Sequence, residues 1–161
     1  MASEISKVES PNRDLSLLCP WFAARLTDAI QICNDKGYPV KLMEGYRSPA
    51  RQDWLYAQGR TRPGKVVTRA RAWQSWHQFS VAGDLVFWDG RKWFWPASSD
   101  ALWDRVTAIM EAHGFSNLDF ERPHFEIHSG VTLAEAYALV QKSGVQAVWD
   151  LIGSRLESSG L

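Results

Sequence analysis

The sequence SWHQFSVAGD at residues 75–84 places a histidine, His77, seven residues before a carboxylate, Asp84. Asp84 opens the apolar run LVFW, which has the length and composition of a buried strand. A spacing of seven does not suit two ligands on one helix face, because neighbours there lie three or four residues apart. We therefore expect His77 in a turn, a bend through the small residues after it, and Asp84 at the start of a strand.

A second histidine, His124, follows far downstream in the sequence ERPHFEIH at residues 121–128. Two imidazoles and one carboxylate are a common three-ligand set for zinc, with the fourth position left for water. Glu121, three residues before His124, is suited to be the general base that takes a proton from such a water. The sequence therefore predicts one zinc ion held by His77, Asp84 and His124, on the condition that the fold brings them together.

The remaining histidines have alternative interpretations. His128 would share a strand face with His124, so it is either a substitute ligand or a neighbour of the site. His113 precedes Gly114 at the expected end of a helix, where a cation suits the helix dipole.

The order of expected elements indicates one α+β domain, an antiparallel sheet with helices packed against it. We expect it to span residues 1–161, with a loosely ordered tail over about 1–13 and no separate binding module. Apolar periodicity, turn residues and capping residues define the elements. The expected helices are 20–37, 48–59, one capped by Ser98 or Ser99 and closed by Gly114, one begun by a capping box at Thr132 and Glu135, and a last one around 148–152. The expected strands are 38–46, 84–88, 92–95 and 124–127, with a short connection before the last.

Composition and charge narrow the function. The chain has 161 residues, a net charge of zero and two cysteines, which we interpret as small apolar core residues. No apolar run approaches the ~20 residues that span a bilayer, and the first residues do not resemble a signal peptide. Eight cations face only Glu44 and Asp53 between residues 41 and 71. This excess favours a basic rim for an anionic partner, a carboxylate-bearing substrate rather than nucleic acid.

The residue order also resembles a known family. The pattern Ser75-x-His77, then Ala82-x-Asp84, then RPHFE at 122–126, resembles the D-Ala-D-Ala carboxypeptidase-like zinc metallopeptidases. Within them it is most similar to the L-alanyl-D-glutamate endopeptidases used as phage endolysins. The resemblance extends upstream to GYRS at 45–48 and QGRTRPG at 58–64, and covers about residues 20–150.

The resemblance implies roles for individual residues. His77, Asp84 and His124 would bind the zinc, and Glu121 would be the catalytic base. Arg47 would contact the substrate or the developing oxyanion, and Ser75 would contact the substrate or a ligand.

It also implies a Hedgehog/DD-peptidase-like fold and a zinc-dependent peptidoglycan endopeptidase that cuts the L-Ala–D-Glu bond of the stem peptide. As a phage endolysin, the protein would be made in the host cytoplasm without a signal peptide and act on the cell wall after holin-mediated release. We expect the peptidoglycan stem peptide as partner, no nucleic acid, no membrane insertion, and a monomer.

Two departures from the family pattern stand out. The family usually has glycine where this chain has Ser80. Its base is often aspartate, preceded by a Trp-Gly-Gly stretch that is absent here, so Asp119 is an alternative base. Two other functions stay open: a D,D- or L,D-carboxypeptidase of the same fold, and a non-catalytic zinc-containing binding module like the Hedgehog signalling domains.

Overall fold

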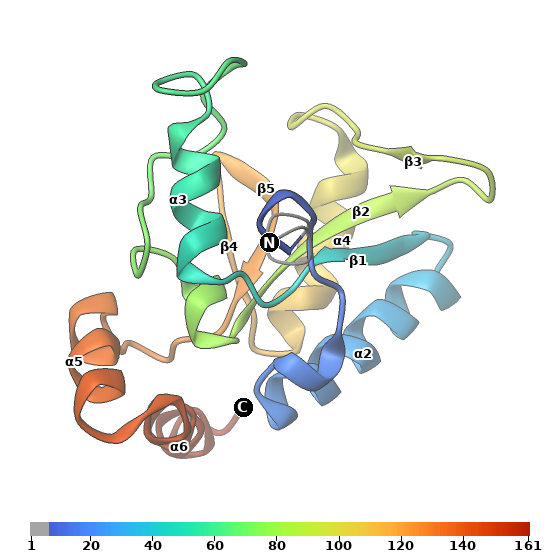
Figure 1. Cartoon of the computed structure of the whole chain (residues 1–161). Helices are drawn as coiled ribbons and strands as arrows, with labels where there is room; N and C mark the ends of the chain where they lie inside the picture. Colours follow the sequence, from blue (N-terminus) through green and yellow to red (C-terminus); the bar gives the residue numbers. More distant parts are fainter. Residues whose placement is uncertain (1–6) are drawn as a thin grey trace.

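The computed structural model describes residues 7–161 and has a five-stranded antiparallel sheet with helices around it (Figure 1). The predicted α+β class is confirmed. The strands run in the order β1-β2-β5-β4, and β3 pairs with β2 beside this path. Their bounds are β1 Val40–Glu44, β2 Ala82–Trp88, β3 Trp93–Phe94, β4 Ser116–Leu118 and β5 Glu121–Glu126.

The helices follow the expected order. They are η1 Leu15–Leu17, α2 Pro20–Asp35, α3 Pro49–Ala57, η2 Trp76–Phe79, α4 Ala101–Ala112, α5 Leu133–Ser143 and α6 Val145–Ser158. Proline occupies the first position of both α2 and α3, where its missing N–H costs nothing. The capping box at Thr132 and Glu135 is confirmed, since each side chain bonds the backbone N–H of the other residue.

Two expectations about elements were wrong. The cap of α4 is Asp100, whose carboxylate accepts from the Leu102 N–H, and not Ser98 or Ser99. Asp100 is an equally good cap and lies at the residue where the helical backbone begins. The connection before the last strand contains β4. With three residues, this strand is too short to show an alternation of apolar and polar residues.

The central strand β2 separates a core face from a site face. Leu85 and Phe87 point to the core, where the Phe87 ring packs edge-on against Trp103 of α4 at 5.0 Å. A Cβ added at Gly83 would meet Leu42 at 3.1 Å, with Leu26 of α2 also in contact. Helices α2 and α4 therefore cover this face. Asp84, the next residue in the alternation, faces the other side of the sheet.

The chain before η1 lies against β1. The Asn12 carbonyl accepts from the Gly45 N–H at 2.7 Å, and Arg13 donates to the Met43 carbonyl at 3.1 Å. Of the expected tail, residues 1–6 fall outside the described residues. Among the helices that are described, none is long and apolar enough to cross a bilayer.

Candidate metal centre

Three acidic and basic side chains lie side by side across the sheet. The strand register pairs Glu44 of β1 with Asp84 of β2, and Asp84 with His124 of β5. The first pairing depends on a β-bulge, because β1 carries one extra residue between Leu42 and Glu44. The bulge moves Glu44 opposite Asp84 on the site face.

His77 reaches the same point from η2. Ser75 caps this short helix by accepting the His77 N–H, so it positions the histidine; a contact between Ser75 and substrate stays a prediction. The His77 side chain is 1% exposed, and its Nε2 lies 3.2 Å from Asp84 Oδ1.

The bend after His77 turns at Ser80, which has φ 61° and ψ 27°. This left-handed conformation is the one that glycine adopts without strain. It explains why the family pattern has glycine here, and Ser80 adopts it at a cost of about 1–2 kcal/mol. The Ser80 backbone is held on both sides, since its N–H donates to the His77 carbonyl and its carbonyl accepts from Cys19.

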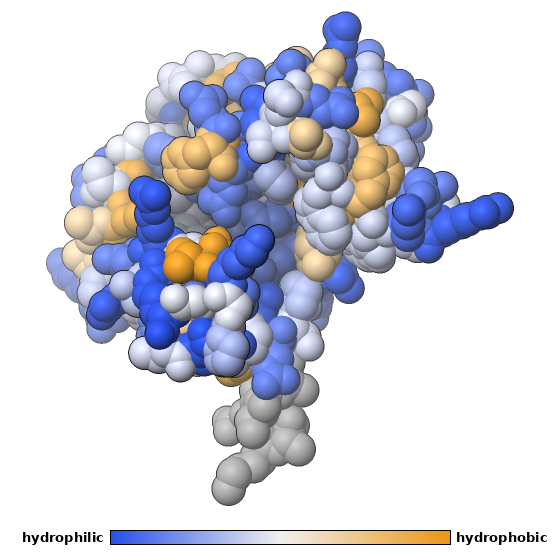
Figure 2. Space-filling model, turned by 90° about the horizontal axis from the view of Figure 1, so that it is seen from above, coloured by the Kyte–Doolittle hydropathy of each residue, from blue (hydrophilic) through white to orange (hydrophobic). Residues whose placement is uncertain are grey.

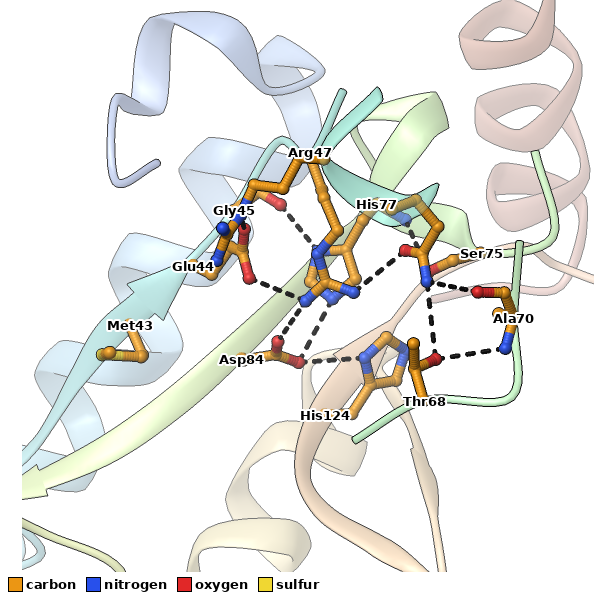
Figure 3. Close-up of polar contacts among 12 residues, drawn as sticks. Met43, Glu44, Gly45, Arg47, Thr68, Ala70, Ser75, His77, Asp84 and His124 are labelled. Carbon is orange, nitrogen blue, oxygen red and sulfur yellow. Dashed lines mark hydrogen bonds and ion pairs between the residues drawn. The ribbon is translucent and has the colours of Figure 1, made fainter. Parts of the chain in front are cut away.

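The predicted ligands converge. One ligand atom each of His77, Asp84 and His124 lies within 4.8 Å of the other two (Figure 3). Oδ1 of Asp84 faces both imidazoles, at 3.2 Å from His77 Nε2 and 3.0 Å from His124 Nδ1. Both histidines are buried, whereas Asp84 is partly accessible.

The second nitrogen of each imidazole is occupied by an outer partner. His77 Nδ1 lies 2.6 Å from the Gly45 carbonyl, which can only accept, so this nitrogen carries the proton and Nε2 is left to bind a metal. His124 Nε2 lies 2.7 Å from Glu126, which leaves Nδ1 for the metal. Such partners fix the ring orientation of metal-binding histidines. Two nitrogens and a carboxylate oxygen held in this way fit zinc.

The electrostatics favour an ionised Asp84. Burial would raise the pKa of Asp84, but the His77 and His124 imidazoles outweigh burial and hold it well below its usual range. Burial likewise would lower the pKa of His124, but hydrogen bonds to Asp84 and Glu126 raise it to about 10. The centre therefore holds Asp84 as a negatively charged carboxylate, the form that binds a cation.

Arg47 lies directly behind Asp84. Its Nη2 donates to Glu44 at 2.7 Å and to Asp84 Oδ2 at 3.0 Å, and its Nη1 donates to Gln52 at 3.1 Å. Burial would lower the pKa of Arg47, but the charges of Asp84 and Glu44 outweigh it and raise the pKa above its usual value. Arg47 therefore fixes the second oxygen of Asp84, and its contact with substrate stays a prediction.

Glu121 opens β5 at the solvent-exposed edge of the site. Asn117 of β4 pairs with Phe125 of β5, and the next residue of β4, Leu118, pairs with Glu121. Between these two pairs β4 advances by one residue and β5 by four, so β5 holds three extra residues. Three extra residues reverse the alternation, so Glu121 turns to the same face as His124. Its charge contributes to the raised pKa of Arg47. Asn117 secures the bulge, since its Nδ2 donates to the carbonyls of Arg122 and His124 at 2.9 and 2.7 Å.

The alternative residues lie outside the cluster. Asp119 is exposed in the turn between β4 and β5. His128 follows β5, stacks on the Trp76 ring at 5.2 Å, and has its Nε2 3.7 Å from Glu126.

Glu126 and Gln52 are site residues that were not predicted. Glu126 stands two residues after His124 on one strand, a same-face spacing that was visible in the sequence. Gln52 is fully buried and bridges Arg47 to the loop after α3. The family resemblance includes Gln52, but nothing in the sequence predicts this bridging role.

Comparison with curated proteins finds a relative of known activity. No family model matches the chain. The chain is 34% identical over 106 residues to the peptidoglycan L-alanyl-D-glutamate endopeptidase CwlK of Bacillus subtilis (strain 168), a match that covers 58% of this chain and 63% of that protein. The chain thus spans somewhat less than two thirds of the length of this relative. The match confirms the resemblance predicted from the motifs: over the matched residues the chain is similar to a peptidoglycan L-alanyl-D-glutamate endopeptidase.

Proposed function

We propose that this protein is a zinc-dependent peptidoglycan endopeptidase that hydrolyses the L-Ala–D-Glu bond of the stem peptide. The observation that carries the proposal is the cluster of His77, Asp84 and His124, with the outer nitrogen of each imidazole held by the protein. The activity named for the relative supports the choice of substrate. From the resemblance alone, we also propose that the protein is a monomeric phage endolysin and that it reaches the cell wall after holin-mediated release.

His77, Asp84 and His124 would hold the zinc ion, which supplies Lewis-acid polarisation of a carbonyl and of water. Glu121 would take a proton from the attacking water and return it to the amine that leaves. Arg47 orients Asp84 and, through its remaining N–H groups, would stabilise negative charge on the carbonyl oxygen. One such donor is typically worth about 3–4 kcal/mol of transition-state stabilisation.

Mass spectrometry of digested peptidoglycan tests the bond that is cut. Purified cell walls treated with the zinc-loaded protein should yield fragments with a new D-glutamyl amino terminus and glycan strands that keep L-alanine. Release of free D-alanine instead would overturn the endopeptidase proposal and identify a carboxypeptidase. Tight wall binding with no released peptide would identify a non-catalytic module.

Replacement of the base tests the mechanism. Glu121→Gln keeps the shape of the side chain but removes its ability to take a proton, so we expect hydrolysis to fall by a factor of about 10²–10⁴ while zinc content stays unchanged. Asp119→Asn is the matched control, because Asp119 is the alternative base two residues away. Full activity in Glu121→Gln together with loss of activity in Asp119→Asn would reassign the base to Asp119.

A further inference from the structure

The loop after α3 forms a lobe whose charged side chains are all positive. Residues 58–71, here called the basic lobe, contain five cations, and no Asp or Glu occurs anywhere from residue 54 to residue 83. The lobe projects beyond the end of α3 in Figure 1. Figure 2 looks down on this end of the molecule, where hydrophilic side chains surround a small apolar patch. Within the basic lobe, the adjacent Val66 and Val67 side chains are each about half exposed.

The basic lobe has a defined backbone. The Gly59 N–H donates to the Arg62 carbonyl at 2.8 Å, and Gln58 Nε2 donates to the Lys65 carbonyl at 3.1 Å. Gly59 has a φ of +77°, and a Cβ at this position would lie 2.5 Å from the backbone nitrogen of Val66. The two arms of the lobe therefore touch, which fixes the backbone that carries the cations.

Three of the five cations are already engaged. The Arg62 guanidinium lies 3.5 Å above the Trp54 ring and donates to the Trp54 carbonyl. Arg60 and Arg71 both lie over the Tyr56 ring, at 3.8 and 4.7 Å. By contrast, the side chains of Lys65 and Arg69 make no hydrogen bond or ion pair within residues 7–161. These two cations keep their full set of donors for a ligand.

The backbone segment that carries Arg69 is tied to the metal centre through Gln52. Its neighbours on both sides, Thr68 and Ala70, bond to Gln52, whose Nε2 donates to the Ala70 carbonyl at 2.8 Å and to Thr68 Oγ1 at 3.4 Å (Figure 3). Gln52 in turn accepts from Arg47, which bonds Asp84. Arg47 itself is already paired with Glu44 and Asp84. Of the two unengaged cations of the basic lobe, Arg69 is thus the one whose sequence neighbours are tied to the site.

We infer that Arg69 pairs with the free carboxylate of the glutamyl residue in the substrate and that the basic lobe selects acidic stem peptides. The inference rests on the proposed function. A glutamyl residue that continues the chain through one carboxyl group leaves its other carboxyl group free, next to the bond that is cut. Arginine matches a carboxylate with two parallel hydrogen bonds. A stem peptide in which this carboxylate is amidated would then be a poorer substrate.

A double-mutant cycle between protein and ligand tests the inference. Calorimetry would compare two synthetic stem muropeptides, one with the free glutamyl carboxylate and one with its amide, binding to zinc-loaded Glu121→Gln protein with and without Arg69→Gln. We expect Arg69→Gln to weaken binding of the free carboxylate by tenfold or more and to leave binding of the amide unchanged. Arg91→Gln, the same charge change in the turn between β2 and β3, should affect neither ligand.

The experiment separates failure of the Arg69 inference from failure of the proposed function. An equal loss with both ligands would overturn the inference, because Arg69 would then act without reading the carboxylate. Equal affinity in all variants would also overturn it. In the active protein, Arg69→Gln should raise KM for the free-carboxylate peptide with kcat retained. If the active protein cleaves neither peptide, the proposed function fails, while the calorimetric cycle still decides the role of Arg69.

Discussion

At the scale of single residues, Ser80 connects a sequence departure to a backbone conformation. The bend that carries His77 towards Asp84 needs φ near +60°, and a serine supplies it where the family pattern has glycine. We expect Ser80→Gly to raise the free energy of unfolding by about 1 kcal/mol with zinc content unchanged. Urea denaturation measures the change. Ser98→Gly, at a position without positive φ, should instead lower stability slightly because glycine loses more entropy on folding. A loss of stability in Ser80→Gly would show that the bend is not strained.

Glu126 orients a metal ligand through its hydrogen bond to His124. It holds His124 Nε2 at 2.7 Å and so leaves Nδ1 for the metal. Loss of such an outer partner typically weakens metal binding by about 10–100-fold. We expect this for Glu126→Gln, measured by competition with a chromophoric chelator. Glu135→Gln, in the capping box of α5, is the control with the same chemical change. Unaltered zinc affinity in Glu126→Gln would mean that packing alone orients His124.

At the scale of elements, the bulge between β4 and β5 puts Glu121 on the same face of the sheet as His124. Asn117 holds it through two carbonyls, and Asn34 of α2 makes the same kind of paired contact to Ile30 and Val40, away from the site. Asn117→Leu and Asn34→Leu should both lower the free energy of unfolding by about 1–3 kcal/mol. Only Asn117→Leu should lower hydrolysis per folded molecule, by about a hundredfold, because small displacements at a reacting centre have large effects. Equal hydrolysis rates in the two folded variants would exclude a catalytic role for the bulge.

Helix α6 contacts the segment that carries His77 through a hydrogen bond. Trp149 of α6 donates from Nε1 to the Phe79 carbonyl at 2.8 Å, at the end of the short helix that carries His77. Trp149→Phe keeps the packing but leaves this carbonyl without its donor, so we expect unfolding to become easier by about 1 kcal/mol. Thermal unfolding measures the loss. Trp103→Phe, which removes a part-buried bond to the Pro96 carbonyl, serves as the comparison. An unchanged melting temperature in Trp149→Phe would show that α6 does not support η2.

At the scale of the whole molecule, the sequence predicts those features that depend on long periodic segments. The helices from Pro20 and Pro49, the strand after Asp84 and the capping box at Thr132 carry strong local signals, and the structure has them all. The convergence of His77, Asp84 and His124 was predictable only as a condition, because it depends on the register between strands that are distant in the sequence.

The features that escaped prediction depend on tertiary structure. β4 has three residues and no periodicity, and the bulges at Met43 and in β5 exist only relative to a partner strand. The bridge made by Gln52 joins residues that no spacing relates. These same features place Glu44 and Glu121 on the site face, so the details of the site are less predictable than the fold.

The central claim is that one zinc ion at His77, Asp84 and His124 supports hydrolysis of peptidoglycan. The direct measurement is a zinc titration of chelator-treated protein, with bound metal and the rate of muropeptide release recorded in the same samples. We predict that both rise together and reach a plateau at one equivalent of zinc, and that Asp84→Asn protein gains neither. Full hydrolysis by the metal-free protein, or a plateau in the rate that Asp84→Asn also reaches, would contradict the account.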